Sequence, residues 1–194
     1  SFQKAKKPLL INELKLIINV IGKDKNEKRK LKNRALILVG FAGGFRRSEL
    51  VDINYEDIEF VTEGVKIFVK RSKTDQSGEG MIKGIPYFTN SEYCPVISLK
   101  NWIEKSRIKS GKIFDISDKS VAITIKKYAA IAGLDSNKYS GHSLRSGFAT
   151  STAELGAEER SIMAMTGHKT TQMVRRYIQE ANLFKNNALN KIKI

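Results

Sequence analysis

The spacing of apolar residues changes twice along this chain, and this change limits the folds open to it. Over residues 9–51 and 95–182, apolar residues recur every three or four positions, which is typical of helices with one buried face. Between residues 58 and 87, short apolar runs alternate with turn-forming residues, as in strands joined by hairpins. No internal repeat or low-complexity linker interrupts the pattern. We therefore expect an α+β fold, mostly helical, with one small three-stranded antiparallel sheet.

The ends of most elements are marked by glycine or by a change in polarity. The expected helices span residues 9–21, 31–42, 47–51, 95–105, 119–132, 143–155, 158–165 and 171–182, and the expected strands span 58–61, 65–70 and 81–87. The charged stretch 23–30 is either a loop or a loosely formed helix start. The last twelve residues carry apolar side chains that can bury a face, namely Phe184, Leu189, Ile192 and Ile194.

The charge of the chain narrows the classes of partner. With 35 Lys and Arg against 20 Asp and Glu, the net charge is +15. A domain this basic favours a polyanion, and DNA carries a phosphate charge about every 1.7 Å of helix axis. A lysine-rich surface without a partner is the alternative. No apolar run is long enough to span a membrane and no basic amphipathic helix stands out, so we expect no membrane partner.

The single cysteine, Cys94, cannot form an internal disulfide, which fits a reducing cytoplasm. As a metal ligand it would need partners, and the chain has only two histidines. We therefore expect a buried or half-buried thiol, and neither a metal nor another cofactor.

Six side chains able to carry positive charge or to transfer a proton lie in short motifs. They are Arg46 in GFAGGFRRSEL, Lys73 in SKT, His142 and Arg145 in GHSLRSG, His168 in TGHKT, and Tyr177 in RRYI. Each has a structural alternative: a solvated helix-end cation, one lysine among many, a helix-cap pair, or a core tyrosine. The alternatives leave the placement of the two histidines unexplained. Both lie beside glycine in the last third of the chain, one three residues before an arginine and one nine residues before a tyrosine.

The order of these motifs resembles the signature of the tyrosine recombinases, the phage integrase family, over nearly the whole chain. The spacings from His142 to Arg145 and from His168 to Tyr177 match those of the family. In GFRRSEL the family's arginine corresponds to Arg46. The next residue, Arg47, is then expected to point outward. The match at Lys73 is less specific, because Lys70 lies nearby.

The resemblance implies a DNA breaking-rejoining fold and an enzyme of DNA recombination or integration, as in mobile elements. It implies that Tyr177 attacks a DNA phosphate and forms a 3′-phosphotyrosine, while Arg46, Arg145 and His168 hold the non-bridging oxygens. Lys73 would protonate the leaving 5′-oxygen. His142 would assist proton transfer from the tyrosine. Glu49 matches an acidic position of the family and is expected to orient Arg46, unless it is only a surface carboxylate.

Physical chemistry agrees with these roles. Arginine binds phosphate oxygens bidentately and stays charged throughout the reaction. A phenol with a pKa of about 10 is ionised in roughly one molecule in 10³ at neutral pH, so we expect a cationic pocket to lower the pKa of Tyr177. The phosphotyrosine conserves the bond energy, so neither ATP nor metal is expected.

The resemblance also implies an organisation and an assembly. Residues 1–182 are expected to form the catalytic domain, with 183–194 as a tail that folds back in cis or passes to a neighbour in trans. The family's N-terminal core-binding domain is expected to be absent, because the first helix already resembles the start of the catalytic domain. The expected partner is double-stranded DNA bound by a homotetramer. A type IB topoisomerase and a non-catalytic DNA-binding protein remain alternatives, and the direction of recombination is not readable.

Overall fold

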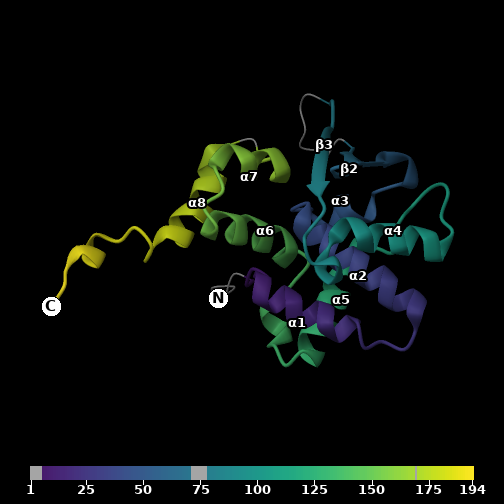
Figure 1. Ribbon diagram of the computed structural model, residues 1–194, viewed down its shortest axis with the longest axis horizontal. Coiled ribbons are helices and arrows are strands. Elements are labelled where there is room, and N and C mark those ends of the chain that lie inside the picture. The colour runs from purple at the N-terminus through teal and green to yellow at the C-terminus, as the bar shows by residue number, and fades with distance from the viewer. Residues whose placement is uncertain (1–5, 71–77, 169) are drawn as a thin grey trace.

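The computed structural model describes residues 6–70, 78–168 and 170–194. Within them the chain forms eight α-helices and one three-stranded antiparallel sheet, which confirms the predicted fold class (Figure 1). The helices are α1 (Ile11–Ile21), α2 (Glu27–Ala42), α3 (Arg47–Val51), α4 (Pro95–Ser106), α5 (Asp118–Ile131), α6 (Ser143–Glu154), α7 (Glu159–Thr166) and α8 (Thr171–Asn182). The strands are β1 (Ile58–Val61), β2 (Gly64–Val69) and β3 (Met81–Pro86).

Helix α2 begins within the charged stretch that the sequence left open between loop and helix. The side chain of Asn26 accepts a hydrogen bond from the backbone N–H of Arg29 at 2.9 Å and so caps the helix. The helix therefore starts at Glu27 rather than at the first apolar residue, Leu31.

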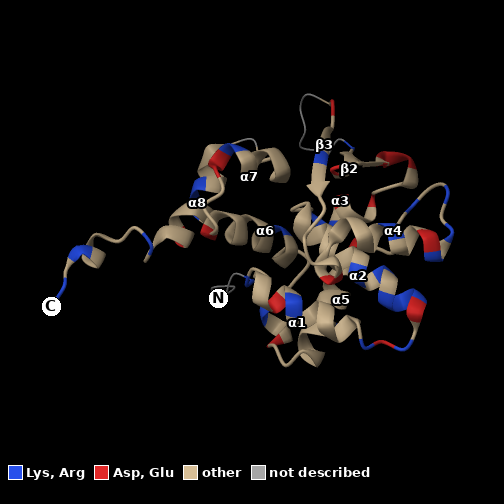
Figure 2. Ribbon diagram, in the orientation of Figure 1, with Lys and Arg blue, Asp and Glu red and all other residues tan. Residues whose placement is uncertain are grey.

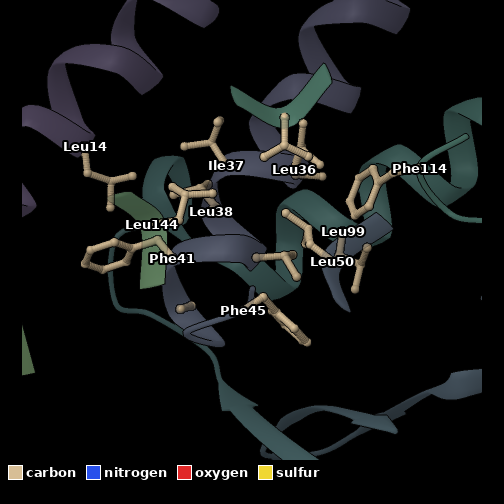
Figure 3. Close-up of a cluster of buried hydrophobic side chains, with 14 of the residues drawn as sticks. Leu14, Leu36, Ile37, Leu38, Phe41, Phe45, Leu50, Leu99, Phe114 and Leu144 are labelled. Atoms are coloured by element: carbon tan, nitrogen blue, oxygen red, sulfur yellow. The ribbon is translucent and has the colours of Figure 1, made fainter. Parts of the chain in front are cut away.

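Most of the molecule packs around α2, whose residues 35–42 are all buried. This first cluster draws side chains from α1 to α5, from the sheet and from the start of α6. In Figure 3, Phe45 lies at the lower edge of this cluster, Phe41 and Leu144 lie at its left, and Leu36 and Phe114 lie at its upper right. We call this part of the molecule, up to Leu144 on α6, the body.

A second, smaller cluster lies beyond the body along α6. It contains Phe148, Ala149, Ala153, Ile162 and Val174. We call the second half of α6 together with α7 and α8 the C-terminal unit. In Figure 1 it lies to one side of the body, and the segment after α8 extends further away from it. Phe184 in that segment is 84% exposed, so the tail buries no apolar face within its own chain.

The sheet has the order β1-β2-β3, and one of its faces packs against the helices of the body. Val65 pairs with Ile85 and Ile67 with Lys83, and all four side chains are buried. On the opposite face Phe68 pairs with Ile82, and both are exposed.

The first described residues are joined to the start of α6. The backbone N–H of Leu9 donates to the carbonyl of Ser143 at 3.0 Å, and the Ser143 hydroxyl donates to the carbonyl of Lys7 at 2.7 Å. Gly147 then packs directly on this segment, because a Cβ there would lie 2.1 Å from the Leu9 carbonyl oxygen. Two hydrogen bonds and one close packing contact therefore hold this segment against α6.

Among the residues described, no helix is long and apolar enough to cross a membrane. The same residues contain no cluster of three or more metal-ligating side chains. Cys94 is a buried free thiol, as predicted.

Candidate functional site

A double-glycine turn between α2 and α3 presents Arg46. Gly44 has a φ of 58°, a conformation that favours glycine. A Cβ on Gly43 would lie 2.2 Å from the ring of Phe45, and one on Gly44 would lie 2.8 Å from the ring of Phe148. The two glycines therefore allow a tight turn that places Arg46 immediately before α3.

Glu49 lies between two arginines that are far apart in the sequence. Its carboxylate accepts a hydrogen bond from the backbone N–H of Arg46 at 2.8 Å. The two carboxylate oxygens lie 3.8 Å from Nη1 of Arg46 and 3.9 Å from Nη1 of Arg145. This arrangement brings the Arg46 and His142–Arg145 motifs to one place.

Arg145 is the most deeply buried cation among these candidate residues, with 1% of its surface exposed. Nη1 donates to the carbonyl of Gly44 at 3.1 Å, whereas the buried Nη2 has no hydrogen-bond partner among the described atoms. Burial, followed by the charge of Arg46, lowers the pKa of the Arg145 guanidinium to about 10. A buried guanidinium with an unused donor is suited to a planar or tetrahedral oxyanion.

A hollow of about 400 Å³ opens beside Arg46. Its lining consists of Arg46, Arg47, Ser48, Ser140, Gly141 and His142. Partial burial and the charges of Arg145 and Arg46 lower the pKa of His142, which favours the neutral form of the imidazole. Arg47 is exposed, as expected, and pairs with Asp118 at 3.4 Å.

The C-terminal unit supplies His168 and Tyr177. Gly167, with a φ of 72°, ends α7, and the next residue, His168, is buried. Its Nδ1 shares a 2.7 Å hydrogen bond with the hydroxyl of Thr166, which orients the ring. The ring centroids of His168 and Tyr177 are 6.4 Å apart. Burial, Arg145 and Arg46 lower the pKa of His168 to about 4, so this side chain is neutral at pH 7.

Tyr177 is half-buried against the second cluster, and the expected sign of its pKa shift was wrong. Burial raises the pKa of the phenol, and the charge of Arg145 opposes this without overcoming it. The cationic influence that the sequence predicted is present. It is outweighed because the phenol also packs against apolar side chains, which disfavours the phenolate.

Of the predicted side chains, Arg46 and His142 line the hollow, and Glu49 lies near both Arg46 and Arg145. His168 and Tyr177 lie close enough to Arg145 for its charge to affect their pKa values. Lys73 lies outside the described residues. A further cation, Lys83, was missed. A lysine in a strand usually faces solvent, but its position has the same parity as the buried Ile85, and this is the signal that marks it as inward-facing.

A mostly helical fold with several cations near a tyrosine matches one known protein family. The model of the phage integrase family matches residues 8–183, and the chain belongs to this family. The match confirms the resemblance seen in the motifs.

Among curated relatives, an integrase/recombinase XerD homologue from Selenomonas ruminantium is 45% identical, over 99% of this chain and 59% of the relative. The tyrosine recombinase XerA of Pyrococcus furiosus is 30% identical, over 93% of this chain and 63% of the relative. The chain thus spans about three-fifths of the length of these relatives.

Solved structures show the same fold at low sequence identity. A crystal structure of XerA recombinase matches all of this chain and 67% of its own, with a TM-score of 0.74 and 19% identity. XerH recombinase bound to its difH substrate matches with a TM-score of 0.72 and 19% identity, over 95% of this chain and 54% of its own. The catalytic domain of bacteriophage HP1 integrase matches with a TM-score of 0.59 and 17% identity, over 97% of this chain and 99% of its own.

Proposed function

We propose that residues 1–182 form the catalytic domain of a site-specific recombinase or integrase that cuts and rejoins DNA through Tyr177. The observation that carries this proposal is the buried guanidinium of Arg145, whose Nη2 has no partner among the described atoms, beside Arg46 and within electrostatic reach of Tyr177. The names of the relatives and the DNA-bound structure of XerH support it.

The proposed reaction conserves atoms and bond energy. The phenolic oxygen of Tyr177 attacks the phosphorus and forms a 3′-phosphotyrosine, and the phosphorus–oxygen bond to the 5′-carbon side breaks. The phenolic proton passes towards His142, and Lys73 protonates the departing 5′-oxygen. Resealing is the same process reversed by a second 5′-hydroxyl, so the proposal requires neither ATP nor a metal.

The arginines stabilise charge that develops on the phosphate. Arg46 and Arg145 donate to the non-bridging oxygens, and Glu49 holds both in register. His168 is neutral in this site, so in the proposal it donates one hydrogen bond to the phosphate rather than a full charge. The bound phosphate also raises the pKa of nearby imidazoles, since a negative charge favours their protonated form.

A nicked suicide duplex tests the proposal directly. The wild-type protein is incubated with a duplex whose nick releases the 5′-fragment, and the DNA-linked peptide is identified by mass spectrometry. We expect the adduct on Tyr177 and none from Tyr177→Phe. The matched control is Tyr55→Phe, a change at an exposed tyrosine, which should leave the adduct unchanged. An intact yield from Tyr177→Phe would refute the proposal and favour a non-catalytic DNA-binding role.

The role of Lys73 is tested by changing the leaving group. A 5′-bridging sulfur needs no proton to depart, so it should restore cleavage to Lys73→Ala but not to Arg145→Ala. Equal failure of both variants would remove Lys73 as the general acid. A plasmid relaxation assay beside a two-site recombination assay distinguishes strand exchange from topoisomerase-like activity.

The proposed partner is double-stranded DNA, and the proposed location is the cytoplasm. Figure 2 shows Lys and Arg on many elements, α2, α4 and the tail among them, in keeping with the net charge of +15. Counterion release predicts that affinity falls more than about tenfold from 50 to 200 mM salt. A smaller fall would argue against a phosphate-dominated contact. The one cysteine, a buried thiol, suits a reducing compartment.

We propose that the protein assembles as a tetramer on DNA by passing residues 183–194 to a neighbouring copy. A largely apolar groove of about 480 Å³ between α1 and α6 offers a receiving site. Its lining includes Leu10, Leu16 and Leu155 together with the acidic residues Glu13 and Glu154. The tail carries the complementary features, exposed apolar side chains and the basic residues Lys191 and Lys193.

Deletion of residues 184–194 should therefore weaken cooperative assembly on two-site DNA, measured by gel shift, more than it weakens cleavage of a single site. Unchanged assembly would show that the tail is not exchanged.

A further inference from the structure

A lysine is buried completely on the inner face of β3. Lys83 is 0% exposed and pairs in register with the buried Ile67 of β2. Its Nζ donates to the carbonyl of Gly43 at 2.7 Å and lies 4.3 Å from the centroid of the Phe45 ring. Both contacts are made to the turn that immediately precedes Arg46.

The same turn is held by a second cation. Lys83 binds the carbonyl of Gly43, and Arg145 binds the carbonyl of Gly44. Burying an ammonium costs far more than burying an apolar side chain of similar length, unless polar or charged partners offset it. A methionine would fill this space at lower cost, so the presence of a charge here calls for a role beyond packing.

The charged groups around Lys83 belong to the site. Burial lowers the pKa of the Lys83 ammonium to about 8, Glu49 raises it, and Arg145 and Arg46 lower it. Lys83 in turn contributes to the lowered pKa of His168. An oxyanion in the hollow would relieve the mutual repulsion of these cations and favour the charged amine.

The same strand also touches the C-terminal unit. A Cβ on Gly167, the residue before His168, would lie 3.1 Å from the sulfur of Met81. Met81 and Lys83 are two residues apart and so project to the same face of β3. This face therefore contacts both the turn that presents Arg46 and the turn that presents His168.

We propose that Lys83 is a positioning residue of the phosphate site, whose buried ammonium holds the Gly43–Phe45 turn and adds a positive charge behind Arg46 and Arg145. The inference rests on the proposed function, because it assigns Lys83 to the reaction of that site. Lys83 does not touch the substrate, and it acts through the turn and through its charge.

The first experiment compares Lys83→Met with Lys66→Met, a change at an exposed lysine on the neighbouring strand. Single-turnover cleavage of the suicide duplex is measured at saturating DNA. We expect Lys83→Met to cleave on the order of 10²-fold more slowly, the loss that misplacement of a reacting group by about 1 Å causes. DNA affinity and the thermal midpoint should not fall, because the substitution removes a buried charge. Lys66→Met should behave as the wild type.

The dependence on pH separates the charge from simple packing. The pKa of Lys83 is about 8 without a ligand, and a bound phosphate should raise it. As pH rises above about 8 towards this higher value, wild-type Lys83 loses its proton, so the ratio of wild-type to Lys83→Met rates should shrink. A wild-type rate in Lys83→Met would overturn the inference. So would a loss that is the same at every pH and parallels a lower thermal midpoint.

A second measurement uses the wild-type chain alone and needs no catalysis. With ¹³C-labelled lysine, NMR follows the titration of Lys83 without and with saturating orthovanadate, a mimic of the phosphate in transfer. We expect the pKa of Lys83 to rise when vanadate is bound, and an unchanged pKa would contradict the inference. Because this readout is independent of covalent DNA, a wild type that forms no adduct would refute the proposed function alone.

Discussion

The two halves of the site are held by their surroundings to different degrees. In the body, the Arg46 turn and Arg145 are fixed by Glu49, by Lys83 and by two glycine carbonyls, beneath a cluster that extends from α1 to α6. In the C-terminal unit, Tyr177 and His168 rest on a much smaller cluster, and the tail beyond them is exposed. The two halves approach each other closely where Phe148 packs on Gly44 and Met81 packs on Gly167.

The difference matches what the proposed reaction requires of each half. A site that stabilises a phosphate benefits from donors fixed before the substrate arrives, because their reorganisation would otherwise add to the barrier. A nucleophile that becomes covalently linked and is later released must change its distance to the phosphorus during each cycle. We infer that the body is the rigid half of the site and that the C-terminal unit is the adjustable half.

The largest expected effect comes from removing Arg145, the buried arginine of the site. Arg145→Ala should slow formation of the covalent adduct by on the order of 10³–10⁵, the loss typical of a phosphoryl-transfer arginine. Arg145→Lys should recover only part of this, since an ammonium cannot replace a bidentate fork. The adduct is quantified by gel, with Arg29→Ala, a change at an exposed arginine of α2, as the control. Near-normal cleavage by Arg145→Ala would place the phosphate elsewhere.

A pair of cavity mutations tests whether the halves unfold separately. Ile162→Ala in the second cluster and Leu50→Ala in the first should each cost about 2–5 kcal/mol. In native-state hydrogen exchange, we expect Ile162→Ala to expose amides of α7 and α8 while α2 stays protected. Leu50→Ala should lower protection throughout. If both variants reduced amide protection in α2 equally, the molecule would unfold as one unit, and the distinction between a rigid and an adjustable half would be wrong.

Acid should weaken the C-terminal unit through His168. Its pKa is about 4 when folded and about 6.5 when unfolded, so between these values the unfolded chain binds the extra proton. Stability therefore falls as pH drops from about 6.5 to 4, by up to about 3 kcal/mol. Denaturant titrations over this range should show the slope, and His168→Asn should flatten it. An unchanged slope would assign the acid sensitivity to other groups, such as His142.

The smallest effect is expected at an exposed ion pair between α7 and α8. Nε of Arg175 lies 3.3 Å from Glu159, and 63% of the arginine side chain is exposed. Arg175→Gln should therefore change the free energy of unfolding by less than about 1 kcal/mol, and the change should vanish in high salt. A larger loss would mean that the C-terminal unit depends on this pair more than on its cluster.

Sequence periodicity predicted the elements well because their apolar faces are local patterns. The short helix 47–51 was predicted with its observed bounds, and the helices from 95 onward differ by a residue or so at their ends. The start of α2 was left open because it depends on a cap, Asn26, rather than on an apolar period.

The sequence motifs predicted which residues belong to the site. They did not predict the properties that depend on three-dimensional packing, such as pKa shifts and contacts between distant segments. The spacing of His142, Arg145, His168 and Tyr177 pointed to one reaction. The raised pKa of Tyr177 depends on a cluster assembled from three helices, which no local pattern reveals. Lys83 was missed because its importance depends on the turn that it contacts, forty residues earlier in the chain.

The contacts between residues Lys7–Leu9 and helix α6 have a mechanical consequence. Two hydrogen bonds and the close packing of Gly147 tie this segment to the helix that carries Arg145. A displacement of Lys7 would therefore act on Ser143, two residues before Arg145 in the same helix. Any force that reaches Lys7 along the backbone would then bear on the arginine on which the proposed phosphate site depends.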